Sequence, residues 1–231
     1  MRKRTTKDVA LCIAVVVLVS LAVGCAHTTK DNKSSKAKKD TKTSVATATD
    51  DVSFPLPKHL ARNPHMLLKS AFNLYLKGEY QQARIVAGYC LKNGMNRSDA
   101  YLLIGKCYYA ERENNMAKVF LQKSIEANRG NGEAYVIMAA IAFDEKNILR
   151  AHYYLNKGKP YNYGNPLFYH YYGVLYYSLG SPSKASVHFA QAINLNPRFG
   201  ASYGGLIRCL EDMDKKELAA NVKRDYERVN K

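Results

Sequence analysis

The sequence predicts an all-α solenoid of stacked helix pairs, because three columns of residues recur at one fixed spacing of 34. The first column is alanine, the second is tyrosine, and the third is alanine or glycine. Their members are Ala83, Ala117, Ala151, Ala185 and Ala219; Tyr101, Tyr135, Tyr169 and Tyr203; and Ala71, Gly105, Ala139 and Gly173. A unit of this kind buries its apolar face only by stacking on its neighbours, so the columns predict a continuous core.

Residues 165–199 show the pattern of one unit most clearly. Two amphipathic segments flank a break at residues 180–182, where a serine is a candidate N-cap and Pro182 suits a first helical turn. Gly173 and Ala185 are small at the places where the two helices are expected to touch. Larger residues one turn away would fill the neighbouring grooves.

A helix–turn–helix unit repeated every 34 residues resembles the tetratricopeptide repeat. The resemblance implies a superhelical solenoid of about five helix pairs over residues 64–231. The expected repeats are 64–97, 98–131, 132–165, 166–199 and 200–231.

The N-terminus resembles the signal segment of a bacterial lipoprotein. Residues 1–8 are basic, residues 9–24 are almost wholly apolar, and Cys25 follows directly. The ending Leu21-Ala22-Val23-Gly24-Cys25 is similar to a lipobox, although Ala22 stands where leucine is usual. This resemblance implies removal of residues 1–24 and acylation of Cys25, with palmitate as an expected chain. The alternative, an uncleaved anchor, is disfavoured because the apolar run is shorter than the ~20 residues that span a bilayer.

Residues 25–63 are expected to be a disordered basic tether after the lipidated cysteine, because they hold too little apolar surface to fold. The residue after Cys25 is Ala26 rather than aspartate. By analogy with lipoprotein sorting in Gram-negative bacteria, this predicts an outer-membrane, periplasm-facing, lipid-anchored protein.

The chain of 231 residues has a net charge of +16. Residues 51–231 carry 25 Lys/Arg and 15 Asp/Glu, so the solenoid itself is only mildly basic. This balance fits an acidic or membrane-proximal partner better than a nucleic acid. Export from the cytoplasm would also separate the chain from nucleic acid.

No residue pattern in the sequence predicts a catalytic or metal-binding site. The six histidines are scattered, and the sequence contains no P-loop, GxSxG, paired-carboxylate or metal-ligand motif. We therefore expect no enzyme, no cofactor, no metal and no small-molecule substrate. Cys90 and Cys107 could lie close together, either as buried thiols or as a disulfide permitted by export.

The first helix of each tetratricopeptide pair lines the concave face, and its residues there define the expected binding groove. The twelfth residue of four successive repeats is aromatic. The predicted groove set is Phe72, Tyr75, Leu102, Tyr109, Val136, Phe143, His170, Val174 and Tyr177. Such a stripe suits a peptide or an amphipathic helix. The alternative is that these aromatic residues belong to the core, which a shift of the register by one residue would produce. The lysine and asparagine clamp that grips acidic chaperone tails is missing at these positions.

A lipobox, a short polar tether and about five repeats resemble the tetratricopeptide outer-membrane lipoproteins of Gram-negative secretion and pilus systems. The type IV pilus biogenesis and stability family, whose members act as pilotins, fits best in size and layout. The resemblance implies a non-enzymatic factor that assists assembly of a secretin or of another pilus or secretion component. Tight-adherence pilus lipoproteins fit the same observations. A further alternative is a scaffold lipoprotein for cell-wall hydrolases or proteases.

Overall fold

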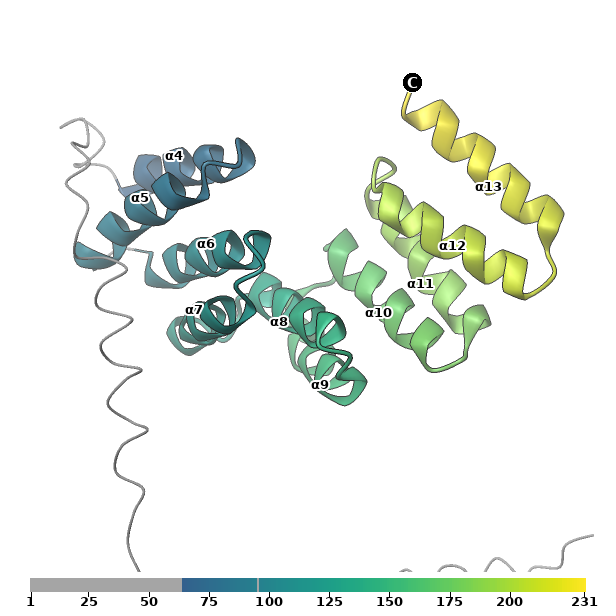
Figure 1. Cartoon of the computed structure of the whole chain (residues 1–231), viewed down its shortest axis with the longest axis horizontal. Coiled ribbons are helices and arrows are strands. Elements are labelled where there is room, and N and C mark those ends of the chain that lie inside the picture. The colour runs from purple at the N-terminus through teal and green to yellow at the C-terminus, as the bar shows by residue number, and fades with distance from the viewer. Residues whose placement is uncertain (1–63, 95) are drawn as a thin grey trace, which may run out of the picture. The chain divides into compact units, whose positions relative to one another are not determined.

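The computed structural model describes residues 64–94 and 96–231, and these form ten α-helices and one short 3-10 helix without a strand (Figure 1). The helices are α4 (Pro64–Leu76), α5 (Tyr80–Lys92), α6 (Arg97–Ala110), α7 (Asn114–Ala127), α8 (Gly132–Asp144), α9 (Ile148–Gly158), η1 (Lys159–Tyr161), α10 (Pro166–Ser178), α11 (Pro182–Leu195), α12 (Gly200–Asp212) and α13 (Lys216–Val229). None of the helices in these ranges is both long and apolar enough to cross a membrane. The predicted signal segment, Cys25 and the tether lie outside the described residues.

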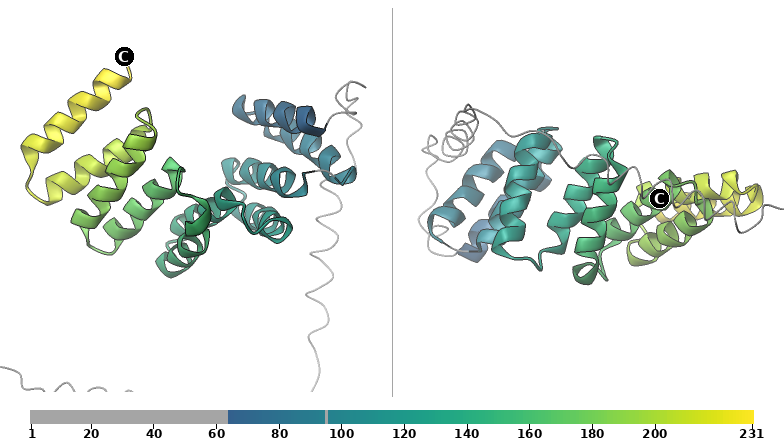
Figure 2. Two further views of the ribbon diagram at one scale, coloured as in Figure 1. Left: turned by 180° about the vertical axis from the view of Figure 1, so that it is seen from behind. Right: turned by 90° about the horizontal axis from the view of Figure 1, so that it is seen from below.

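The helices pack as consecutive pairs, which confirms the all-α solenoid (Figures 1 and 2). Each first helix packs against the second helix of its own pair and against the first helix of the next pair. Each second helix also packs against the first helix of the following pair, although this contact is sparser between α9 and α10 than elsewhere. The first helices α4, α6, α8, α10 and α12 therefore form one continuous row.

One turn conformation recurs within all five pairs. The residues with positive φ in these turns are Gly78, Arg112, Lys146, Gly180 and Asp214. The next residue donates its backbone N–H to the carbonyl five positions earlier, as in Glu79 to Leu74 at 2.9 Å and Lys215 to Leu210 at 2.8 Å. This hydrogen bond satisfies a carbonyl that the ending helix leaves unpaired. Three of the five turns lack glycine, so helix packing rather than glycine imposes the left-handed residue there.

The helices approach most closely where a large residue of a second helix meets a glycine of a first helix. A Cβ atom on Gly105 would lie 2.9 Å from Leu121, and one on Gly173 or Gly205 would lie 2.6 Å from the Phe189 ring. Phe189 of α11 is therefore held between α10 and α12. The sequence predicts that Gly173 meets Ala185, but its nearest neighbour is Phe189, one turn farther along α11.

In the sequence, Gly158 and Pro160 predict that the second helix of the third pair ends early, and α9 does end at Gly158. A buried amide compensates for the missing helical turn. Asn162 donates hydrogen bonds to the backbone carbonyls of Gly132 at 3.0 Å and Gly158 at 2.8 Å. The end of α9 is thereby tied to the start of α8.

The last helix is less buried than its sequence predicts. Leu218, Val222 and Tyr226 recur on one apolar face, which predicts that they pack inward. Leu218 and Tyr226 are instead 51% and 37% exposed, Val222 is half-buried, and only Ala219 of α13 is buried. The reason is geometric, because α13 packs mainly against α12 and no described helix covers its other side.

Two adjacent glycines of α12 give opposite predictions for stability. Gly205→Ala should lower the free energy of unfolding by ~1–3 kcal/mol, because the new methyl group would overlap the Phe189 ring. Gly204→Ala should raise it by ~0.5–1 kcal/mol, because a Cβ there meets no atom within 4 Å and alanine favours the helix. Urea or thermal unfolding of both variants measures the difference, and equal effects would contradict the packing described around Phe189.

Candidate protein-binding groove

The aromatic column of the first helices lies at the boundary between core and solvent. Tyr75 of α4, Tyr109 of α6, Phe143 of α8 and Tyr177 of α10 are all half-buried. Their bodies pack against neighbouring helices, while part of each ring stays accessible. This combination is what a binding surface needs, because a half-buried ring is held in place and can still cover a partner's apolar side chain.

An apolar pocket of about 420 Å³ lies at one end of this column, between α4 and α6. Its apolar lining comes from Leu68, Phe72, Leu102 and Leu103, and its polar lining from His65, Lys69, Asn96, Asp99, Lys106 and Glu133. The Lys106 ammonium lies 5.4 Å from the Phe72 ring centre and 5.1 Å from that of Tyr75. It also forms an ion pair with Glu133 at 2.6 Å, which fixes the cation above the aromatic rings.

The middle of the row is closed by contacts between three first helices. Phe143 stacks on Tyr171 with ring centres 5.9 Å apart. Tyr109 lies near Tyr171 and Asp144, and burial raises the pKa of both tyrosines. These contacts join α6, α8 and α10 and divide the groove into two parts.

A second apolar pocket, of about 280 Å³, lies between α10 and α12. It is lined by His170, Val174, Tyr177, Phe189, Ala201, Gly204, Gly205 and Arg208. The pocket exists because α12 presents small residues, and a Cβ on Gly204 would meet no atom within 4 Å. Tyr177 lies at the rim near Asp212, which raises the pKa of its hydroxyl, and the Arg208 guanidinium lies 6.0 Å from its ring centre.

His170 is a neutral member of this second pocket. Burial lowers the pKa of its imidazole to about 4. Its Nδ1 lies 3.0 Å from the Ser202 hydroxyl, and its ring contacts Phe189 and Phe199. The imidazole therefore contributes an uncharged ring to the pocket wall at neutral pH.

The structure places the predicted groove residues in two pockets and the aromatic strip between them. Phe72 and Leu102 line the first pocket, and His170, Val174 and Tyr177 line the second. Tyr75, Tyr109 and Phe143 are the half-buried residues of the strip.

One member of the predicted set requires correction. Val136 is 0% exposed and packs in a core cluster with Leu155, Phe168 and Leu175. The packing of α10 against α8 covers it, so it lies beneath the groove surface.

Tyr171 is a groove residue that the sequence does not reveal. The residues 34 and 68 positions before Tyr171 are Ile137 and Leu103, which are both buried. The repeat pattern therefore predicts that Tyr171 belongs to the core. Only the contact with Phe143 shows that this ring belongs to the aromatic strip.

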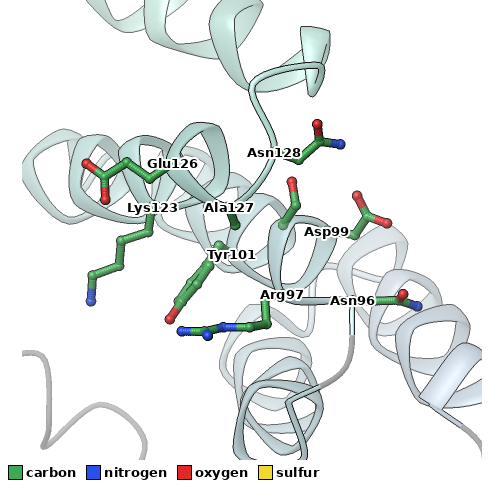
Figure 3. A pocket seen from close by; sticks show the side chains of 9 residues that line it. Asn96, Arg97, Asp99, Tyr101, Lys123, Glu126, Ala127 and Asn128 are labelled. Carbon is green, nitrogen blue, oxygen red and sulfur yellow. The ribbon is translucent and has the colours of Figure 1, made fainter.

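A third pocket, of about 780 Å³, lies between the start of α6 and the end of α7 (Figure 3). It is lined by Asn96, Arg97, Ser98, Asp99, Tyr101, Lys123, Glu126, Ala127 and Asn128. Figure 3 shows the side chains of Arg97, Tyr101 and Lys123 extending to one side, away from Asp99. Its charges are mixed and do not converge on one point, so the apolar groove is the better candidate for a site.

The described residues offer little for catalysis or metal binding. Cys90 and Cys107 are buried as thiols rather than joined in a disulfide. Burial raises the pKa of Cys107 to about 12 and that of Cys209 to about 11, so neither forms a reactive thiolate at neutral pH. Within residues 64–94 and 96–231, no three His, Cys, Asp or Glu side chains are grouped so that they could hold a metal ion.

Comparison with known proteins agrees with the repeat pattern. Residues 98–131 match the family model described as the tetratricopeptide repeat. The chain has the tetratricopeptide-repeat fold. Tetratricopeptide domains serve as scaffolds for protein–protein interaction, since stacking of the repeats creates an extended binding surface. No curated protein is a significant match to the sequence.

Three solved structures illustrate the likeness. A structure reported for the functional characterization of Pseudomonas aeruginosa PilF has a TM-score of 0.63 at 14% identity, covering 71% of this chain and 75% of that one. A crystal structure of the MamA protein has a TM-score of 0.54 at 22% identity over 68% of this chain and 91% of that one. A chain of the APC/C hetero-tetramer Cut9–Hcn1 has a TM-score of 0.64 at 15% identity, covering 73% of this chain and 33% of that one. At these identities the likeness concerns the fold alone.

The buried imidazole of His170 predicts a pH dependence of stability. Its pKa is about 4 in the folded chain against the ordinary value of 6.5 for a solvated histidine, so the unfolded chain binds the proton more readily between these values. Stability should therefore fall as the pH is lowered from about 6.5 towards 4, and should be insensitive to this group above 6.5. The midpoint of thermal unfolding should drop less between pH 7 and pH 5 in His170→Gln than in the parent chain. His188, whose pKa is also lowered by burial, retains part of the dependence. An unchanged slope in the variant would contradict the burial of His170.

Proposed function

We propose that this chain is a non-enzymatic envelope lipoprotein whose groove binds an apolar segment of a protein partner. The observation that carries the proposal is the pair of apolar pockets connected by a strip of half-buried aromatic rings on the row of first helices. Two separated pockets suit two apolar anchor side chains of one segment, and the strip between them suits its backbone or smaller residues.

The rim of the groove indicates the chemistry of the segment. Lys69 and Lys106 border the first pocket, and Arg208 borders the second. A partner with apolar anchors flanked by a few acidic or neutral polar residues would match this rim. The cations would then orient the segment, while burial of its anchors would supply most of the affinity.

The place of action in this proposal is the inner leaflet of the outer membrane. The lipobox ending at Cys25 and the basic tether support it, although both lie outside the described residues. The resemblance of the chain's layout to pilotin-like lipoproteins supports a role in assembling a secretin or another pilus or secretion component. The fold-level likeness to Pseudomonas aeruginosa PilF is consistent with that role. Deletion should then reduce pili or secretin multimers, whereas altered cell-wall cleavage would favour a scaffold for hydrolases.

Filling the second pocket tests the groove directly. Gly204→Leu should fill part of the space between α10 and α12 without backbone strain, because a Cβ there meets no atom within 4 Å and the pocket of about 280 Å³ offers room for the rest of the side chain. We expect the thermal midpoint to be unchanged or higher, while binding of the partner captured by the parent chain falls at least ~30-fold, as loss of an anchor worth ~2 kcal/mol requires. Crosslinking in cells, followed by affinity measurement with the purified partner, provides the readout.

Ala220→Leu is the matched control for this experiment. It adds a comparable leucine at an exposed position of α13, away from the groove. Partner binding should be the same as in the parent chain. If Gly204→Leu binds as tightly as Ala220→Leu while both remain folded, the second pocket is not a binding site.

The anchor has a separate test. Cys25→Ser should abolish incorporation of radiolabelled palmitate and leave the precursor unprocessed, because the thiol of Cys25 is the group expected to take the lipid. Metabolic labelling of the parent and variant chains gives the answer. Labelling that persists in Cys25→Ser would refute the lipobox interpretation without affecting the groove.

A further inference from the structure

A long part of the repeat domain carries positive charge only. Between Glu145 and Glu211 the sequence contains seven Lys/Arg and no Asp or Glu. This segment includes α9, η1, α10, α11 and most of α12. The cations are Lys146, Arg150, Lys157, Lys159, Lys184, Arg198 and Arg208. Among the described residues, none of these seven forms an ion pair, whereas Arg84, Lys106 and Lys118 each pair with a glutamate of the next repeat.

Large apolar side chains are exposed on the same segment, and several of them lie on or next to α9. Leu149 is 84% exposed and Tyr163 is 70% exposed, with Tyr153 and Tyr161 about half exposed. Leu149, Tyr153 and Lys157 follow one another at intervals of four residues, so they lie on one face of α9. We call the surface made by Leu149, Tyr153, Lys157, Lys159, Tyr161 and Tyr163 the α9 ridge.

Side-chain contacts hold several rings of the ridge in place. The Lys157 ammonium lies 5.8 Å from the centre of the Tyr153 ring. Tyr161 stacks on Tyr135 with ring centres 6.3 Å apart. The Tyr153 ring meets that of Tyr154 edge to face, with ring centres 5.3 Å apart. In Figure 1, α9 lies at the outer edge of the helix stack.

The combination of exposed leucine, amphipathic tyrosine and lysine matches the interfacial region of a bilayer. Tyrosine places an apolar ring and a polar hydroxyl at headgroup depth, and lysine is attracted to anionic headgroups. Glu145 is the acidic residue nearest in sequence to α9, directly after the end of α8. Its carboxylate forms an ion pair with Lys118 at 2.6 Å. An acidic peptide would contact only a few of these residues. An extended anionic surface would contact the whole ridge at once and would disfavour carboxylates within about 10 Å of it, and the ridge itself has none.

We propose that the α9 ridge is a membrane-contact surface that docks the repeat domain on an anionic lipid leaflet. This inference does not depend on the groove, which is built from the first helices, whereas the ridge belongs to a second helix and the turn after it. Docking through α9 would hold the domain against the leaflet in a defined orientation, which a flexible lipid-linked tether alone would not do.

The test uses the full-length chain and a fluorescent probe within the ridge. The sequence contains no tryptophan, so Leu149→Trp introduces a single reporter at the most exposed ridge position. The chain is added to vesicles of phosphatidylglycerol and phosphatidylethanolamine, or of phosphatidylcholine alone, each with brominated acyl chains that quench nearby tryptophan. Quenching is measured rather than co-sedimentation, because the predicted N-terminal anchor would hold the chain on either vesicle.

We expect a blue shift and quenching of Leu149→Trp on the anionic vesicles and neither change on the neutral ones. Adding Lys157→Glu and Lys159→Glu should reduce the quenching to the neutral-vesicle value, since each basic residue near an anionic leaflet contributes about fivefold to binding. High salt should have the same effect.

Two matched controls separate the ridge from general adsorption. Leu218→Trp places the reporter at another exposed leucine, on α13 beside Glu217, and should show equal emission on both vesicles. Lys216→Glu with Lys223→Glu makes the same change in net charge on α13 and should leave the quenching of Leu149→Trp intact. Equal quenching of Leu149→Trp on both vesicle types would overturn the proposal. So would a response of this reporter to polyglutamate but not to anionic vesicles, which would assign the ridge to an acidic protein.

Discussion

The architecture depends on one kind of contact, in which a large side chain of a second helix packs against a small residue of a first helix. The small residue is alanine in α4 and α8 and glycine in α6 and α10. Leu121 against Gly105, and Phe189 between Gly173 and Gly205, are examples in which the small residue is glycine. Because these side chains are buried and the backbone approaches them within van der Waals distance, the contact fixes the separation and the register of neighbouring pairs. Phe189 belongs to one pair and touches the next, so the same ring sets the geometry both within and between repeats.

The groove follows from this arrangement. Because one face of every first helix packs against the second helix of its own pair, the adjacent face carries residues that this second helix does not cover. Pockets open where the next first helix offers little bulk, as α12 does with Ala201 and Gly204 beside Val174. They close where first helices contact one another directly, as α8 and α10 do around Val136. The groove is consequently a pair of pockets separated by the Tyr109, Phe143 and Tyr171 contacts.

Charge is distributed unevenly over the same scaffold. In the earlier repeats, some basic side chains form ion pairs with glutamates of the next repeat. The segment from Lys146 to Leu210 contains no aspartate or glutamate. A repeat fold permits such asymmetry because its stability comes from contacts between neighbouring units and not from charges on the outer surface. The outer surface of one repeat can thus diverge in function while the inner packing stays constant.

The spacing of 34 residues was enough to predict the helix pairs and their order, because small and aromatic residues that recur at this interval fit the stacking of helix–turn–helix units. The sequence also indicated the early end of α9. It further indicated that most of the predicted groove residues lie at the surface of the first helices, since position within a repeat specifies the direction of a side chain, while their role in binding stays a prediction. Local pattern could not separate Val136 from Leu102, which share a column but differ in what the next helix covers. For the same reason, the sequence pattern placed Tyr171 among core residues and predicted Ala185 instead of Phe189 as the neighbour of Gly173. These cases were resolved only by the packed structure, because burial depends on the distance between neighbouring helices, and that distance is set by side chains in a different repeat.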